Sequence, residues 1–211
     1  MQQLWQLKVN WDDPLNTEFK EHWQGIQQNL PMIRCMLIDR LVLSEEKVTK
    51  VELHGFSDES ELAYGACLYI RSIDVHGKIT TKLLCSKSRV APLKRLSLPR
   101  LELYAAVLLA DMYQASSRAL KVSFNKIRFW TDPMVVLAWL SSPATRWKTF
   151  VANRVSHIHE ITAVENWNHI SSKENPADLV SRGVDANTLN GYSKWKPTGQ
   201  GVKKLPILVK K

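Results

Sequence analysis

Four acidic residues stand where predicted strands end or predicted helices begin: Asp58, Glu102, Asp132 and Asp178. Two of them directly follow strand-like segments, 51–57 and 126–131. Glu102 lies in the first turns of a helix that Pro99 opens, and Asp178 follows Asn175-Pro176-Ala177, a helix-start pattern with Asn175 as the cap. Strand ends and helix starts on one sheet can converge at a single edge, where four carboxylates would repel one another unless cations joined them.

Such a set of carboxylates specifies a metal site. Hard oxygen ligands with no His or Cys beside them suit Mg²⁺ or Mn²⁺ better than zinc. Two such ions, about 3.5 to 4 Å apart, can activate a water and stabilise the leaving oxygen in phosphodiester hydrolysis. Each acid also has an ordinary interpretation. Asp58 lies in a turn-like sequence, Asp132 could cap a helix, Asp178 suits the first turn of a helix, and Glu102 could be a solvated acid.

The elements that must position these acids form an α/β pattern. Strands are predicted at 51–57, 62–70, 79–85, 126–131 and 167–171, and helices at 99–115, 134–140 and 147–161, with a further one near Asp178. A meander of strands followed by helices that alternate with further strands favours a mixed sheet with helices packed on it.

The charge of the chain favours a polyanionic partner. The 211 residues carry a formal charge of +9, and nucleic acid leads the partners that such a field attracts. Basic residues bracket the acids in sequence and are predicted to contact phosphates: Lys87, Arg89, Lys94, Arg95, Arg100, Arg146, Lys148 and Arg154. The alternative is that they serve solubility.

Three regions are predicted along the chain: a helical connector over 1–50, a main domain over 51–185 and an irregular basic tail over 186–211. The connector is helical because Phe19, Trp23, Ile26 and Leu30 recur at helical spacing. No run of about 18 apolar residues occurs, so no membrane partner is expected and the location is expected to be intracellular. Cys35, Cys67 and Cys85 are interpreted as reduced core residues.

Several segments together resemble the ribonuclease H region of BEL/Pao-type retrotransposon polyproteins: 54–58, 98–103, 130–132, 146–154 and 175–183. The order Asp, Glu, Asp, Asp is that of the ribonuclease H family. The lead-in, with Leu4-Trp5 and the segment 11–15, is similar to the connector that follows the reverse transcriptase in those polyproteins.

This resemblance implies a ribonuclease H-like mixed five-stranded sheet, preceded by the short connector. It implies an enzyme that cuts the RNA strand of an RNA/DNA hybrid with two Mg²⁺ or Mn²⁺ ions. Asp58, Glu102 and Asp132 would form the inner metal cage, and Asp178 would complete it. The implied partners are the hybrid and the reverse transcriptase portion of the same polyprotein. The implied location is a cytoplasmic retroelement particle or the nucleus.

Other functions stay open at this point. Glu59, which adds charge near the metals, and Pro133 depart from the family pattern and are compatible with a catalytically silent scaffold that binds nucleic acid. An aspartic peptidase, a label sometimes given to this region of Pao polyproteins, needs an Asp-Thr-Gly or Asp-Ser-Gly loop, and neither tripeptide occurs. An integrase would have Glu as its third acid. His169 is interpreted as a structural histidine of the last strand, and Trp139 and Trp147 as core residues.

Overall fold

The computed structural model describes residues 9–34, 41–43 and 47–184. The chain separates into two compact units, one holding helix α2 and the other holding a sheet with its helices. Each unit is described by itself.

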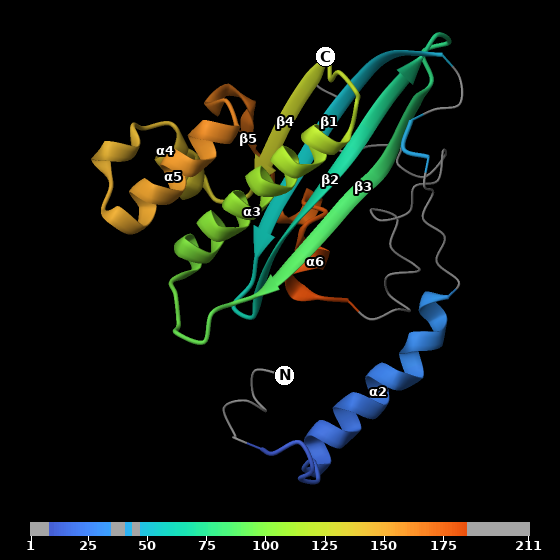
Figure 1. Ribbon diagram of the computed structural model, residues 1–211, viewed down its shortest axis with the longest axis vertical. Coiled ribbons are helices and arrows are strands. Elements are labelled where there is room, and N and C mark those ends of the chain that lie inside the picture. The colour runs from blue at the N-terminus through green and yellow to red at the C-terminus, as the bar shows by residue number, and fades with distance from the viewer. Residues whose placement is uncertain (1–8, 35–40, 44–46, 185–211) are drawn as a thin grey trace. The chain divides into compact units, whose positions relative to one another are not determined.

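The sheet has five strands in the order β3-β2-β1-β4-β5 (Figure 1). Their bounds are β1 Val48–Glu59, β2 Ala63–Asp74, β3 Ile79–Val90, β4 Lys126–Thr131 and β5 Trp167–His169. The first three strands form an antiparallel meander. Strand β4 then pairs parallel with β1, and β5 pairs parallel with β4. The mixed five-stranded sheet predicted from the sequence is confirmed.

The meander strands are longer than predicted, because each spans 12 residues. Most of β2 is buried on both faces, so its sequence shows no alternation of polar and apolar residues that would mark its ends. By contrast, β5 is shorter than predicted. It ends at His169, and the chain soon turns into a short 3₁₀ segment, Ser172–Glu174.

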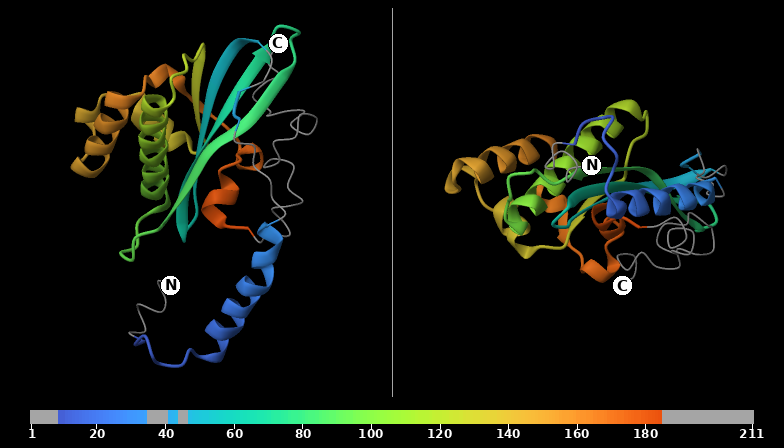
Figure 2. Two further views of the ribbon diagram at one scale, coloured as in Figure 1. Left: turned by 45° about the vertical axis from the view of Figure 1, so that its right-hand side comes forward. Right: turned by 90° about the horizontal axis from the view of Figure 1, so that it is seen from below.

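Helices cover the two faces of the sheet unequally. Helix α3 (Leu98–Ala119) and helix α5 (Thr149–Ile161) lie on one side, and the short helix α6 (Asp178–Arg182) lies on the other (Figure 2). Helix α4 spans Met134–Leu140, as predicted. The larger core lies under α3 and includes Leu53, Leu68, Leu103, Leu109 and Phe129. A smaller cluster lies by α6: Phe56, Cys67, Tyr69, Leu83, Ile170 and Ala177.

Gly55 lets α3 pack closely on the middle of β1. A Cβ atom at this position would lie 2.6 Å from Leu109 and 3.0 Å from Leu68 and Phe129. The first distance is shorter than real carbon contacts and the other two are tighter than most, so a side chain at this position would have to displace Leu109 of α3.

The other unit contains helix α2, Thr17–Ile33, which begins where Asn16 accepts a hydrogen bond from the Phe19 amide at 3.0 Å. None of its residues is buried, and Trp23, Ile26 and Leu30 are exposed.

The division of the chain at residues 50 and 185 stays a prediction. Both the tail predicted for 186–211 and Cys35 lie outside the described residues. In the parts that the structure describes, no helix is long and apolar enough to cross a membrane.

A buried polar cluster lies on the face of the sheet opposite α3. Glu52 accepts from Arg71 at 2.8 Å and lies 3.2 Å from His54 Nε2. The indole N–H of Trp130 points at His54 Nδ1, 3.4 Å away. Because an indole can only donate, Nδ1 is the acceptor and the His54 ring carries its proton on Nε2, facing Glu52. The hydrogen bond from His54, together with Arg71, lowers the pKa of Glu52 to about 2 against the burial that opposes it.

This cluster predicts an acid-sensitive contribution to stability. A carboxyl whose pKa is lowered by folding stabilises the protein above its unfolded pKa of 4.5, and the stabilisation is lost as the pH falls toward 2. We expect wild type to exceed Glu52→Gln by about 2 kcal/mol in free energy of unfolding near neutral pH. In urea titrations at successive pH values, that difference should shrink below pH 4.5. A difference that is constant with pH would contradict the assignment.

Candidate active site

Asp58 and Asp132 lie side by side at the ends of two neighbouring parallel strands. Ser57 pairs with Thr131 across the β1–β4 ladder, and each aspartate is the next residue along the chain. Asp58 is 5% exposed, whereas the Asp132 side chain is 34% exposed. Asp132 does not cap helix α4, because the cap position is Pro133. The carboxyl ends of these strands therefore present one buried and one accessible carboxylate.

Glu102 reaches the same end of the sheet from the first turns of α3. Its side chain shares a hydrogen bond with Glu59, the last residue of β1. Two carboxyls can hydrogen-bond only when one of them carries a proton. Glu102 Oε2 is also buried and has no donor among the described residues. Burial and the charges of Asp132 and Asp58 raise the pKa of Glu102 to about 7. Burial, followed by the charge of Glu102, raises the pKa of Glu59 to about 8.

Asp178 opens helix α6, on the face of the sheet opposite α3. Its side chain is 28% exposed and accepts a hydrogen bond from Arg182, one helical turn later. Its charge still reaches Asp58. Burial raises the pKa of Asp58 to about 6, with the charges of Asp178 and Asp132 adding to the effect and a hydrogen bond from Ser181 opposing it. The four acids predicted from the sequence are thus gathered at one end of the sheet.

Asp58 is held by donors that the sequence did not assign to it. Ser181 Oγ donates to Asp58 Oδ2 at 2.5 Å, and Asn175 Nδ2 lies 3.3 Å from Asp58 Oδ1. Asn175 also donates to the Ser57 carbonyl at 2.9 Å. The prediction that Asn175 caps the last helix is wrong, because α6 begins at Asp178 and its cap position is Ala177. The amide group of Asn175 points at the end of β1 instead.

Asp132 has partners in β5, the strand next to β4, and in the 3₁₀ segment just after it. Ser172 donates to Asp132 Oδ2, and His169 Nε2 lies 3.6 Å from Oδ1. His169 lies in β5, as the sequence suggested, but it is the last residue of that strand and is exposed at the site end. It therefore contacts a candidate metal ligand rather than the core.

The donor set fits a hard divalent cation. Carboxylate oxygens are the ligands that Mg²⁺ prefers, and Glu102 Oε2 is a buried oxygen that lacks a donor. The acids lie near enough to perturb one another, yet no three His, Cys, Asp or Glu side chains within the described residues form a ready metal-binding group. Each carboxylate is instead turned toward a neighbouring donor or acid: Ser181, Ser172, Arg182 or Glu59.

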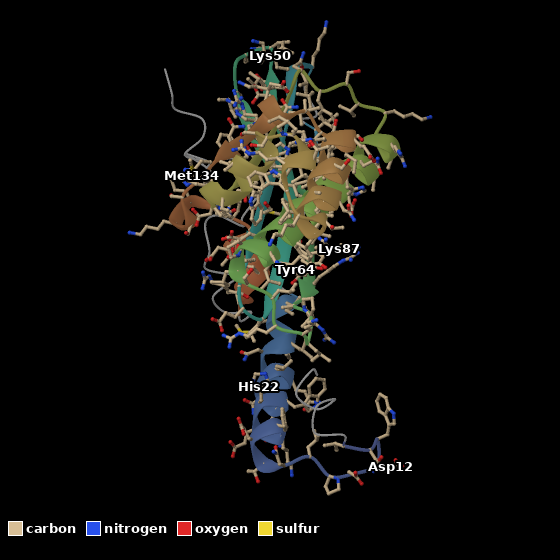
Figure 3. The ribbon with its side chains drawn as sticks, turned by 90° about the vertical axis from the view of Figure 1, so that its left-hand side faces the viewer. Asp12, His22, Lys50, Tyr64, Lys87 and Met134 are labelled. Carbon is tan, nitrogen blue, oxygen red and sulfur yellow. The ribbon has the colours of Figure 1, made fainter. Side chains whose placement is uncertain are left out.

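Several of the predicted phosphate-binding residues lie at this same end. Asp58, Gly65 and Ser88 lie in a row across β1, β2 and β3, so Lys87 and Arg89 flank the row on the edge strand. Figure 3 shows Lys87 and Tyr64 together, with Lys50 at the opposite end of the sheet. Lys94 and Arg95 are exposed in the loop between β3 and α3.

The other predicted basic residues lie on α3, on α5 and just before α5. The Arg100 guanidinium lies over the Phe150 ring at 4.7 Å, and Lys148 is exposed beside the start of α5. Arg146 lies over the Trp147 ring at 5.8 Å. Arg154 is stacked on Phe150 at 3.8 Å and donates to the Tyr104 hydroxyl at 2.7 Å. Arg154 therefore ties α5 to α3.

The two tryptophans predicted to be core residues, Trp139 and Trp147, are partly buried against the larger core. Trp147 donates to the Trp139 carbonyl at 3.3 Å. This contact closes the connection between α4 and α5, and it is consistent with a packing role.

A family model described as the Pao retrotransposon-like RNaseH-like domain matches residues 1–133. That span includes Asp58, Glu102 and Asp132 and ends before Asp178. Among curated proteins, none matches the chain.

Similar solved structures include LC11-RNase H1, an enzyme isolated from compost, in complex with an RNA/DNA hybrid. It has 14% identity and a TM-score of 0.42, over 66% of this chain and 99% of that one. RNase H1 from Halobacterium salinarum has 12% identity and a TM-score of 0.36, over 68% of this chain and 99% of that one. Prototype Foamy Virus protease-reverse transcriptase has 12% identity and a TM-score of 0.33, over 77% of this chain and 22% of that one.

The strand order, the mixed pairing and the acids at the strand ends define a ribonuclease H-like protein. More narrowly, the chain belongs to the Pao retrotransposon-like RNaseH-like domain family, whose model matches well over half of its length.

Proposed function

We propose that this chain is a retroelement ribonuclease H that hydrolyses the RNA strand of RNA/DNA hybrids during reverse transcription. The observation that carries the proposal is the gathering of Asp58, Asp132 and Glu102 at one end of a ribonuclease H-like sheet. Membership of the Pao retrotransposon-like RNaseH-like domain family supports it.

In this proposal Asp58, Glu102 and Asp132 hold two Mg²⁺ or Mn²⁺ ions, and Asp178 completes the set. When bound, such a pair supplies an activated water and stabilises the leaving oxygen. The chain supplies buried carboxylates whose negative charge is costly without a counter-charge, which favours cation binding. Asp178 is more exposed than Asp58, so it is the better placed to exchange ligands with solvent.

The basic residues support the same substrate. Lys87 and Arg89 flank the Asp58 row on β3, Arg100 lies two residues before Glu102 in α3, and Lys148 is exposed just before α5. Basic side chains near a negative site suit a nucleic acid that passes over the acids, because they can neutralise its phosphates. A hybrid would be recognised by its shape and its 2′-hydroxyls rather than by its sequence.

We further propose that the chain acts beside the reverse transcriptase portion of the same polyprotein, in a cytoplasmic retroelement particle or the nucleus. The family match supports the association with the reverse transcriptase, because it covers the lead-in that resembles a connector.

The experiment that tests the function is cleavage of a labelled RNA/DNA hybrid by the full chain. We expect cleavage with Mg²⁺ or Mn²⁺ and its complete loss with EDTA, because the clustered acids need cations to act. A second function, a silent scaffold that binds nucleic acid, is favoured by the Glu59–Glu102 contact, which adds an acid to the site. Tight hybrid binding that is indifferent to EDTA, with no cleavage under any metal, would support the scaffold and overturn the nuclease.

A further inference from the structure

Both oxygens of Asp58 face donors from the segment around α6. Asn175 approaches Oδ1 and Ser181 donates to Oδ2. Both donors are almost completely buried, at 1% and 2% exposure. Two donors on two different oxygens fix the plane of a carboxylate as well as its position, so the rotation of the Asp58 side chain is restricted from both sides.

The donors are themselves held by close packing. Asn175 Oδ1 accepts from the Ala177 amide at 3.1 Å, which leaves its Nδ2 to point at β1. Ser60 Oγ donates to the Ser181 carbonyl at 2.8 Å. Gly65, the partner of Asp58 on β2, makes room for this segment, because a Cβ there would lie 2.5 Å from Val180.

These donors leave ligand positions on Asp58 unused. An ionised carboxylate offers about four lone-pair sites, and one donor on each oxygen leaves about two for other partners. Donors of this kind orient a metal ligand without replacing the metal, and their loss weakens metal binding even though they never touch the ion.

We infer that Asn175 and Ser181 are positioning residues that orient the Asp58 carboxylate for cation binding. The inference rests on the proposed function, since it assigns Asp58 as a metal ligand. It adds two residues to the four acids, and it makes the docking of α6 part of the metal site.

The test is a titration of the full chain with Mn²⁺ alone, followed by electron paramagnetic resonance, for wild type, Ser181→Ala, Asn175→Ala and Ser181→Thr. We expect Mn²⁺ to bind about 10- to 100-fold more weakly to the two alanine variants. Threonine keeps the hydroxyl and should recover most of the affinity. If Asn175→Ala does not fold, the comparison of Ser181→Ala with Ser181→Thr still decides the outcome.

The matched control is Ser57→Ala. Ser57 is fully buried beside Asp58, but its hydroxyl points at the Trp130 carbonyl, 3.5 Å away, and not at an acid. We expect this variant to bind Mn²⁺ like wild type. Thermal unfolding in EDTA reports the loss of stability in each variant separately from its Mn²⁺ affinity.

The outcomes separate the positioning role of Asn175 and Ser181 from the proposed metal site itself. If wild type binds Mn²⁺ and Ser181→Ala binds it equally well, the positioning role is wrong while the nuclease proposal stands. An equal loss in Ser57→Ala would show a general packing effect and would also overturn the positioning role. If wild type itself binds no Mn²⁺, the proposed metal site fails and the inference fails with it.

Discussion

Asp58→Asn and Asp132→Asn are each expected to abolish hydrolysis of the hybrid while the protein stays folded. Asparagine keeps the size of the side chain but removes the charge that holds a cation. Loss of several kcal/mol of metal-dependent stabilisation of the transition state corresponds to a rate reduction of at least about 10³-fold. The measurement is initial cleavage rate with saturating Mg²⁺, beside circular dichroism of each variant.

The stability of Asp58→Asn gives a second, independent readout. Burial raises the pKa of this carboxyl from 3.8 to about 6, so stability is lost as the pH rises from 3.8 toward 6, and the full cost of the ionised form is present above pH 6. The neutral amide avoids that cost, and in EDTA at pH 7 the variant should therefore unfold at the same temperature as wild type or higher. Gain of stability with loss of activity is the signature of a buried functional acid rather than a structural one.

Asp111→Asn is the matched control for these variants. Asp111 is an exposed acid on α3 whose partner is His157, 2.7 Å away on α5, and neither residue lies among the four acids. Its removal should leave the cleavage rate unchanged. Near-full activity in Asp58→Asn or Asp132→Asn would show that the acids are assigned wrongly.

The elements that position the acids could be read from the sequence because each carries a local signal. Asp132 follows a short predicted strand and precedes Pro133, and the structure places it directly after β4. Helix α3 begins at Leu98, one residue before the start predicted at Pro99, and Glu102 lies in its first turns as predicted. Strand ends were less predictable, since β2 is buried on both faces and its sequence changes little at its ends.

The side chains that hold the acids could not be predicted in the same way. Asn175-Pro176 is a local helix-start pattern, and by itself it favours a cap. The structure sends the Asn175 amide to Ser57 and Asp58, more than a hundred positions earlier in the chain. That contact depends on how closely the segment packs on Gly65, which is a property of the tertiary structure. The nearest signal in the sequence is that Ser181 follows Asp178 by less than one helical turn.

Strand selectivity and product chemistry are expected to separate the nuclease from its alternatives completely. With Mg²⁺ the chain should cut RNA paired with DNA and leave duplex DNA intact, because the 2′-hydroxyl marks one strand while the paired DNA strand sets the groove shape. Products should carry 5′-phosphate and 3′-hydroxyl ends, since an activated water attacks phosphorus and the 3′-oxygen leaves. End-labelled hybrids and duplexes of one sequence, resolved beside alkaline ladders, measure both the strand that is cut and the ends that form.

A cyclic 2′,3′-phosphate would identify the 2′-hydroxyl as the nucleophile and exclude the two-metal mechanism. Peptide cleavage that EDTA does not affect would point instead to a peptidase.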